Sequence, residues 1–295
     1  MHGDRPLRLA TRGSAQARTQ ARSVAEAMMA ANPDLIVELV FVETLGDRTQ
    51  HDEVPLHTIG GLGVFVKEIE QAVLCGDADM AVHSAKDLPS SVAAGLHLGA
   101  LCERRDARDA LIGATLVGLP PGAIVATGSV RRRAQLVVAR PDLQFLELRG
   151  NIHTRLGKVP AGGAIVMAAA ALEILGLSGE ITDYLPPESF VPSPGQGCVA
   201  VECRADDNEM IEALAGIDHQ QTREAVEIER AFLAELGSGC SLPVGAHAAG
   251  RTLTAFLATG DHRHHALETI TLPEDHDVAI ARSAELARSM RDALP

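Results

Sequence analysis

Apolar runs of strand length alternate with helical patterns along most of this chain. Residues 7–12 and 35–43 are rich in Leu, Val and Ile and predict strands. Between them, Ser14 is placed to cap a helix that runs to about residue 31. The further elements expected up to residue 175 are strands at 79–84, 123–127, 144–148 and 164–167, and helices at 64–75, 130–139, after 151 and at 168–175. This order predicts an α/β architecture.

The chain divides further at a stretch rich in proline and glycine, residues 185–197, which predicts a hinge. The strand and helix patterns before it form two similar halves, as in a bilobal protein. The apolar run 198–204 predicts one more strand, which could return to the first lobe. From about residue 218, a helix at 222–236 and a strand-like run at 252–258 predict a small third domain.

At 295 residues the chain is long enough for two or three domains, and its apolar fraction of 46% is ordinary for a globular enzyme. No apolar run approaches the roughly 18 residues of a membrane span, so no membrane partner is expected. An apolar signal segment is absent after Met1, and five cysteines lack a paired spacing, which favours a reducing cytoplasm. Cys198 and Cys203 should point to opposite faces of a strand, so neither a disulfide nor a metal site is expected.

The formal net charge is −13, with 39 acidic against 26 basic residues. Binding to nucleic acid needs a basic field, so this balance argues against a nucleic-acid partner. An anionic ligand must then be met by a local cluster of cations. Only Lys67, Lys86 and Lys158 are lysines, so arginine, whose planar fork suits carboxylates, carries nearly all the positive charge.

Polar side chains gather where the predicted strands end. Ligands of open α/β sheets bind outside the carboxyl ends of the strands, so these groups should converge on one cationic crevice. The residues that share this placement are Arg12, Ser14, Ser84, Lys86, Asp87, Thr127, Ser129, Arg131, Arg132, Arg149, Asn151 and Arg155. Such an arginine-rich cleft indicates a ligand with several carboxylates.

Cys240 lies at the tip of a glycine turn that follows an amphipathic helix, with Gly237, Gly239 and Pro243 around it. A structural cysteine would more often lie inside an apolar run. The thiol is therefore interpreted as an attachment point for a bulky group. The alternative is a free thiol on a surface loop.

The other signals also have structural alternatives. The arginines at 131–133 are typical of the solvated face of a helix, and Ser14 and Ser129 are typical N-caps. The glycine cluster 60–63 lacks the Lys-Ser/Thr of a P-loop. His83 is either catalytic or a hydrogen-bonded structural residue. Three histidines of a predicted turn are interpreted as surface residues rather than metal ligands: His262, His264 and His265.

Ten short segments stand out in order along residues 10–245. They are 10–14 (ATRGS), 44–47 (TLGD), 60–65 (GGLGVF), 82–89 (VHSAKDLP), 108–110 (RDA), 127–132 (TGSVRR), 148–156 (LRGNIHTRL), 194–197 (PGQG), 201–204 (VECR) and 229–245 around Cys240. In this order they resemble the porphobilinogen deaminase (hydroxymethylbilane synthase) family, and several of the strings are too long for chance agreement.

The resemblance implies three α/β domains, the first two arranged like a periplasmic binding protein and the third a small α+β domain. The expected domains are residues 1–100 with 198–218, residues 101–197, and residues 219–295. The resemblance also implies a transferase of tetrapyrrole (heme) biosynthesis with a dipyrromethane cofactor joined to Cys240 by a thioether. Such an enzyme joins four porphobilinogen molecules head to tail, releases ammonia at each condensation and frees hydroxymethylbilane by hydrolysis. A cytoplasmic monomer is expected.

The family's functional residues carry over position by position. Asp87 matches the catalytic aspartate, a carboxylate that would stabilise the positive charge developing beside the pyrrole nitrogen. Each pyrrole unit adds two carboxylates, which suit bidentate arginine contacts. The positions that hold the cofactor are matched by Lys86, Thr127, Ser129, Arg131, Arg132, Arg155 and Cys240. The positions around the incoming ring and the growing chain are matched by Arg12, Ser14, Arg149 and Arg155.

Residues 44–60 run for about 17 positions without clear periodicity and are interpreted as a mobile lid. Leu45 and Leu62 stand where many family members carry a basic residue, so this lid is less basic than usual. Cys198 stands where a small alanine is common.

Two other function classes compete with this interpretation. A catalytically inactive binding protein would use the same cleft for an anionic small molecule, but simple capture requires neither Cys240 nor Asp87. A nucleic-acid binder acting through the arginines at 131–133 is disfavoured by the net charge.

Overall fold

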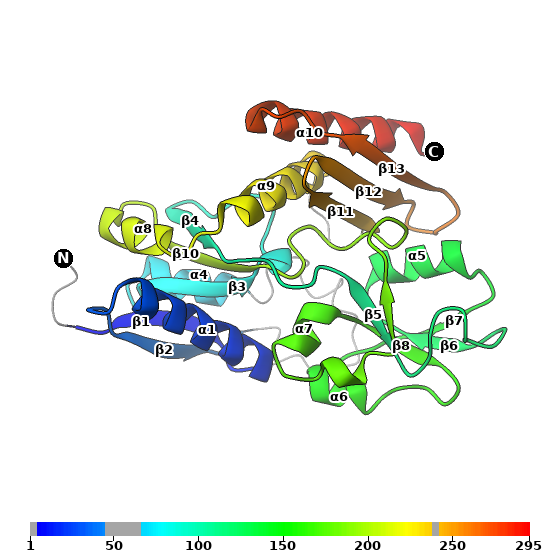
Figure 1. Ribbon diagram of the computed structural model, residues 1–295, viewed down its shortest axis with the longest axis horizontal. Coiled ribbons are helices and arrows are strands. Elements are labelled where there is room, and N and C mark those ends of the chain that lie inside the picture. Colours follow the sequence, from blue (N-terminus) through cyan, green and yellow to red (C-terminus); the bar gives the residue numbers. More distant parts are fainter. Residues whose placement is uncertain (1–4, 45–65, 238–241) are drawn as a thin grey trace. The chain divides into compact units, whose positions relative to one another are not determined.

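The computed structural model of this chain describes residues 5–44, 66–237 and 242–295. These residues form three sheets, two of five strands and one of three, with helices packed on them (Figure 1). The described residues fall into two compact units. The first unit holds residues 5–44, 66–105 and 198–223, and the second holds residues 106–197, 224–237 and 242–295. The predicted α/β fold class is confirmed.

The first unit contains a mixed sheet of order β2-β1-β3-β10-β4. Its strands are β2 (Val37–Val42), β1 (Leu7–Arg12), β3 (Met80–Ser84), β10 (Val199–Arg204) and β4 (Leu96–Leu101). β1 runs parallel to β2 and β3, whereas β10 runs antiparallel to both β3 and β4. Successive side chains point to opposite faces of these strands, so the sheet carries a separate core on each face.

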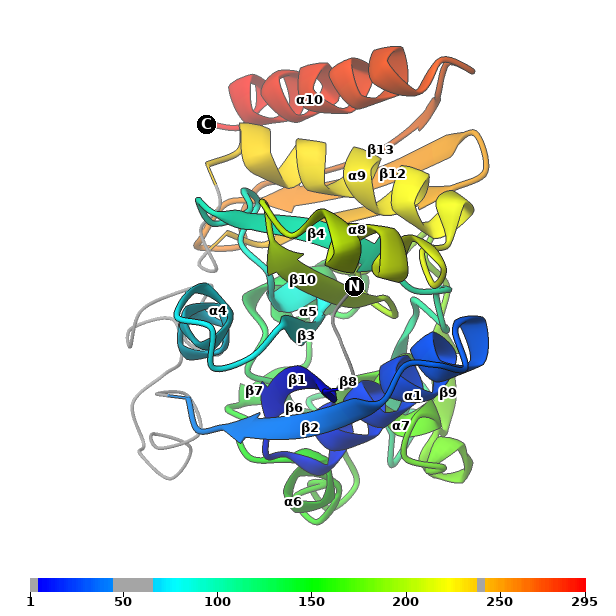
Figure 2. The ribbon, with the colours of Figure 1, turned by 90° about the vertical axis from the view of Figure 1, so that its left-hand side faces the viewer.

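One face of this sheet packs against α1 (Ala15–Ala31) and α8 (Asn208–Ala215). The core between them includes Leu9, Val82 and Val201, all buried. Figure 2 shows α1 running along β1 and β2.

The other face packs against α4 (Lys67–Leu74), whose apolar side chains meet Ala81 of β3. Because side chains alternate along a strand, His83 lies on this same face, and its cross-strand contact Glu202 lies there too. β3 then ends in a short 3-10 turn, η2 (Ala85–Asp87).

The second unit contains a sheet of order β7-β6-β8-β5-β9. Its strands are β7 (Gln144–Leu146), β6 (Ile124–Ala126), β8 (Ala164–Ala168), β5 (Asp109–Ile112) and β9 (Asp183–Leu185). The helices that accompany it are α5 (Val130–Ala139), α6 (Ile152–Leu156), α7 (Ala169–Glu173) and the 3-10 turn η3 (Ser178–Glu180). β6 runs parallel to β7 and β8, so the carboxyl ends of these three strands share one edge.

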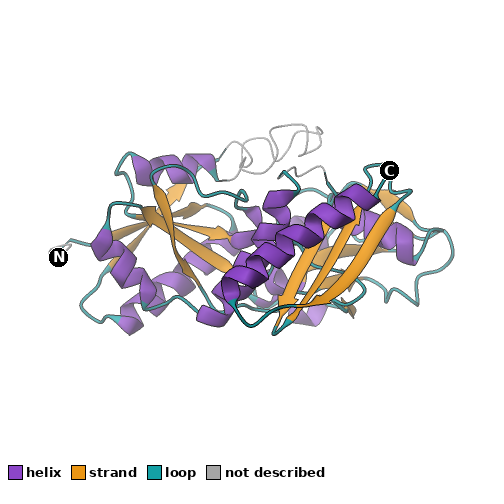
Figure 3. Cartoon of the chain, turned by 90° about the horizontal axis from the view of Figure 1, so that it is seen from above, coloured by secondary structure: helices purple, strands orange, loops and turns teal. Residues whose placement is uncertain are grey.

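The C-terminal part forms the antiparallel sheet β11-β12-β13 with two long helices. Its elements are α9 (Gln220–Glu235), β11 (Val244–Ala249), β12 (Thr252–Ala258), β13 (His265–Thr271) and α10 (His276–Ala293). Phe232 of α9, Leu253 of β12 and Met290 of α10 meet in one buried cluster. In Figures 1 and 3, α10 and these strands lie next to one another.

Most predicted elements are present. The strand expected at 198–204 does return to the first sheet as β10. The elements absent from the sequence prediction are β4, β5, β9, β11, β13, α8 and α10. The expected domain boundaries near residues 100, 197 and 218 stay a prediction.

Candidate functional site

The carboxyl ends of β1 and β3 lie at one edge of the first sheet, because these strands are parallel neighbours. Arg12 ends β1, and Ser14 follows it directly. Lys86 and Asp87 belong to the turn η2 that follows β3. All four side chains are partly exposed. The structure therefore brings these four predicted site residues to the same sheet edge.

Backbone and side-chain contacts within the first unit hold the turn that carries Asp87. The Ala85 N–H donates to the Cys198 carbonyl at 3.0 Å, which ties the turn to the start of β10. The Gln20 side-chain nitrogen donates to Ser84 Oγ at 3.1 Å, which ties the end of β3 to α1. Asp87 thus stands on a segment braced from two neighbouring elements.

Ser14 and Ser129 are both helix N-caps, which confirms the prediction that these serines cap helices. Ser14 Oγ accepts a hydrogen bond from the Ala17 N–H at 3.3 Å, and Ser129 Oγ accepts one from the Arg132 N–H at 3.4 Å. A capping hydroxyl uses its oxygen as the acceptor and keeps its own O–H as a donor. Capping is therefore compatible with a contact to a ligand carboxylate.

In the second unit, a further set of predicted residues follows the parallel strands β6 and β7. Thr127 and Ser129 come after β6, and the Ser129 N–H donates to Thr127 Oγ1 at 3.2 Å. Arg149 and Arg155 come after β7, and Arg155 Nε donates to the Gly150 carbonyl at 2.7 Å. These four residues share one edge of the second sheet.

Arg131 and Arg132 do not lie on a solvated helix face, so that alternative is wrong for these two residues. Their side chains are 6% and 9% exposed, and both guanidinium groups pair with the carboxylate of Asp109 at 2.7 Å. Arg133 is exposed, and its guanidinium lies 5.2 Å from the ring centre of Phe145. Successive residues of a helix are rotated by about 100° around its axis. Of the three arginines on α5, only Arg133 therefore faces solvent.

The buried arginine pair is also held by carbonyl groups. Arg131 Nη1 donates to the Val191 carbonyl at 2.7 Å, and Arg132 Nη1 donates to the Val166 carbonyl at 3.2 Å. Burial alone would raise the pKa of Asp109, but the charges of the two arginines outweigh it and hold that pKa well below its usual range. Two guanidinium groups against one carboxylate leave a net positive charge in this cluster, which suits an anionic ligand.

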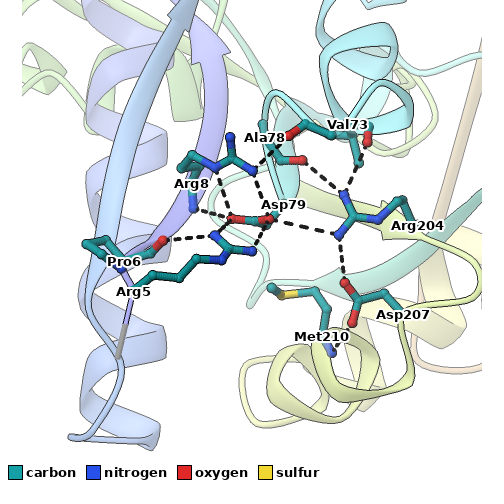
Figure 4. Close-up of polar contacts among 10 residues, drawn as sticks. Arg5, Pro6, Arg8, Val73, Ala78, Asp79, Arg204, Asp207 and Met210 are labelled. Carbon is teal, nitrogen blue, oxygen red and sulfur yellow. Dashed lines mark hydrogen bonds and ion pairs between the residues drawn. The ribbon is translucent and has the colours of Figure 1, made fainter. Parts of the chain in front are cut away.

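A second buried carboxylate, Asp79, was not predicted as important. Arg5 Nη1 and Nη2 donate to its two oxygens at 2.8 Å each, and the Arg8 backbone N–H donates to it at 2.8 Å (Figure 4). Arg204 adds an ion pair at 3.9 Å. Burial raises the pKa of Asp79, but the hydrogen bonds from Arg5 and Arg8 outweigh it and set the pKa well below normal.

The Asp79 cluster lies at the end of β3 opposite to η2 and joins three strands of the first sheet. Its arginines come from positions 71 to 74 residues earlier in the chain and from the end of β10. No local sequence signal marks such a cluster, because only the pairing of β1, β3 and β10 brings the partners together.

Several sequence predictions fall outside the described residues. They concern the thiol of Cys240, the glycine cluster 60–63 with Leu62, and Leu45 with the rest of the expected lid. Among the described residues, four cysteines are free thiols, namely Cys75, Cys102, Cys198 and Cys203.

Within residues 5–44, 66–237 and 242–295, no helix has the length and apolar character needed to cross a membrane. The same described ranges contain no group of three or more His, Cys, Asp or Glu side chains arranged to hold a metal ion. His264 and His265 are exposed, and His262 is partly buried.

Two family models match this chain. The model described as "Porphobilinogen deaminase, dipyromethane cofactor binding domain" matches residues 7–212. The model described as "Porphobilinogen deaminase, C-terminal domain" matches residues 223–292.

Curated relatives are similar over most of the chain. A porphobilinogen deaminase of Acidothermus cellulolyticus is 49% identical over 249 residues, which cover 81% of this chain and 74% of the relative. A porphobilinogen deaminase of Thermobifida fusca is 44% identical over 301 residues, which cover 97% of this chain and 93% of the relative. Among solved structures, a TRAP periplasmic solute binding protein from Desulfovibrio salexigens has a TM-score of 0.44 at 10% identity, covering 75% of this chain and 74% of that chain.

Proposed function

This chain belongs to the porphobilinogen deaminase family, and from that membership we propose how its own residues carry out the family's reaction. The enzyme is a transferase of tetrapyrrole biosynthesis that acts on porphobilinogen and carries a dipyrromethane cofactor. Four porphobilinogen molecules are joined head to tail, each condensation forms one carbon–carbon bond and releases one ammonia, and hydrolysis frees hydroxymethylbilane.

Asp87 is the catalytic carboxylate of this proposal. As the carbon–nitrogen bond of the aminomethyl group breaks, positive charge develops beside the pyrrole nitrogen. A fixed carboxylate that accepts a hydrogen bond from the pyrrole N–H stabilises that charge. The observation that carries the proposal is the position of Asp87, on a braced turn at the same sheet edge as Arg12, Ser14 and Lys86.

We assign the binding of the carboxylates of the cofactor and of the growing chain to positively charged and hydroxyl side chains that follow the strands of the two five-stranded sheets. The residues assigned to the cofactor are Lys86, Thr127, Ser129, Arg131, Arg132 and Arg155, and those assigned to the substrate and growing chain are Arg12, Ser14, Arg149 and Arg155. The net positive charge of the arginine pair on Asp109 supports this assignment, because buried positive charge favours an anionic partner. When bound, the dipyrromethane supplies the pyrrole carbon to which the first porphobilinogen is joined.

Cys240 holds the cofactor as a thioether, which keeps the product attached while its reactive end is extended. We further propose that the enzyme works as a cytoplasmic monomer without a nucleic-acid or membrane partner. The acidic net charge of −13 supports the absence of a nucleic-acid partner.

The attachment site is tested by the intact mass of the purified protein beside that of Cys240→Ser. The wild type is expected to exceed its sequence mass by two linked pyrroles, and the variant is expected to lack this excess. A wild type that stays unmodified, even after incubation with porphobilinogen or preformed hydroxymethylbilane, would favour an inactive binding protein instead.

The role of Asp87 is tested with Asp87→Asn, which keeps the size of the side chain but removes its charge. We expect this variant to load the cofactor normally and to lose roughly 10²- to 10⁴-fold in kcat. Asp77→Asn, a change at an exposed position of the same unit, serves as the control and should leave kcat unchanged. Turnover at the wild-type rate by loaded Asp87→Asn would remove Asp87 from the mechanism.

A further inference from the structure

A pair of buried ionisable side chains lies just before the turn that carries Asp87. His83 is on β3 and Glu202 is on the neighbouring strand β10, with side chains only 2% and 1% exposed. His83 Nε2 and Glu202 Oε2 are 3.2 Å apart, yet neither atom has a well-formed hydrogen bond in the described part of the chain. Native proteins rarely leave buried polar atoms in this condition, so the pair calls for an explanation.

The charged groups that face the pair come from three elements. Helix α4 places Glu70, which is 8% exposed, and the exposed Lys67 on this side of the sheet. β1 and β3 are parallel neighbours in which Ala10 pairs with Ala81. Two residues further along both strands, Arg12 is therefore opposite His83 on the same face of the sheet. On β10, Arg204 is two residues beyond Glu202 and pairs with Asp79 and Asp207. β4 places the apolar Leu98 opposite Glu202.

Burial of a polar group is costly unless a partner compensates it. The 3.2 Å between His83 Nε2 and Glu202 Oε2 is within the distance of an ion pair. Neither atom has another hydrogen-bond partner among the described residues, so each side chain depends on the other.

The carboxyl group of Glu70 on α4 is affected by the charges of the pair. Burial raises the pKa of Glu70, and the negative charge of Glu202 raises it further, while His83 and Lys67 act in the opposite direction. Glu70 and the pair are therefore electrostatically coupled across the interface between α4 and the sheet.

We propose that the buried contact between His83 and Glu202 acts as a positioning pair that fixes the end of β3, and with it Asp87, for the condensation reaction. The proposal rests on the function proposed above. His83 is followed by Ser84 and then directly by the turn η2, so a shift of its ring is transmitted to Asp87 through four peptide bonds. The pair does not touch the reacting atoms, and its effect is expected on kcat rather than on KM.

Glu202→Gln tests the pair, because it removes the carboxylate and keeps its shape. The variant is expected to lose roughly tenfold in kcat with KM unchanged, because the neutral amide cannot form an ion pair with the His83 ring as the carboxylate can.

His83→Gln provides a second test, because it removes the other partner of the pair. It should lower kcat by a similar factor with KM unchanged, and the double variant should lose no more than either single variant, since both changes break the same contact. This variant also carries the test if Glu202→Gln does not fold, as judged by circular dichroism.

All measurements use enzyme whose cofactor content has been verified by mass. Glu38→Gln, at an exposed position on β2 of the same sheet, is the matched control and should keep kcat near the wild-type value. A wild-type kcat in Glu202→Gln or His83→Gln, or losses that add up in the double variant, would overturn the positioning role. Failure of the proposed function is a different result, namely a loaded wild type that releases no hydroxymethylbilane at any pH.

Discussion

At the scale of single residues, buried carboxylates remain charged here because arginines reach them from other elements. Asp109 on β5 meets Arg131 and Arg132 of α5, and Asp79 meets Arg5 and Arg8. A buried charge without a partner is strongly unfavourable, whereas a paired one with further hydrogen bonds is tolerated. Such clusters therefore specify which elements must pack together.

Asp109→Asn should show how much the stability of the fold depends on the carboxylate between Arg131 and Arg132. The variant leaves two buried guanidinium groups without an anion, so the free energy of unfolding should fall by about 3–5 kcal/mol. Urea unfolding at neutral pH measures this change. Asp142→Asn removes the exposed pair with Arg140 and is expected to have a far smaller effect.

The same variant has a predicted pH dependence. The pKa of Asp109 is lower in the folded chain than in the unfolded chain, where an aspartate titrates near about pH 4. The stability that its charge contributes is therefore fully present above that pH and is lost as the pH falls toward the folded pKa. Acidification should destabilise wild type more steeply than Asp109→Asn. Equal slopes would show that Asp109 is not the group responsible.

At the scale of elements, local patterns predict well where apolar runs are continuous. The strand at residues 7–12, the helix at 130–139 and the strand at 252–258 have the bounds expected from sequence. β4 was missed because Gly99 interrupts its apolar run, and β5 was missed because it begins with the charged Asp109. Both strands are stabilised mainly by neighbours that the local sequence does not contain.

The candidate site, too, was predictable where it depends on local sequence and not where it depends on distant partners. Its residues were expected at strand ends, and each unit does gather its own set at one sheet edge. The burial of Arg131 was not predictable, because its carboxylate partner Asp109 lies 22 residues away. Nor does any local signal join His83 to Glu202, which meet only because a late strand pairs with β3. Convergence of the two sets on one crevice stays a prediction.

The packing of β11 makes a further prediction at this scale. A Cβ atom added at Gly245 would lie 2.7 Å from the Val191 carbonyl oxygen and 3.1 Å from that of Pro192. Because these atoms belong to the backbone, Gly245→Ala should lower the free energy of unfolding by about 1–3 kcal/mol. Gly260→Ala is the control, since no atom lies within 4 Å of the added Cβ there. Equal unfolding midpoints in urea for the two variants would contradict this account.

At the scale of the second unit, one carboxylate joins distant parts of the chain. Glu229 of α9 is fully buried, and its oxygens accept hydrogen bonds from the Gly195 N–H at 2.7 Å and the Ala248 N–H at 2.8 Å. The helix that leads toward Cys240 is thereby tied both to the segment before β10 and to the C-terminal sheet.

The order of strands in the first sheet also has a consequence for biosynthesis. β10 lies between β3 and β4, yet it is made only after residues 106–197 have been translated. Until then the nascent chain carries β3 with an open edge and β4 without the strand on which it pairs in the described sheet. Open strand edges favour pairing with other chains, so the nascent chain is most prone to aggregation during this interval. The Asp87 turn, which bonds to Cys198, is completed only when the ribosome has passed that position.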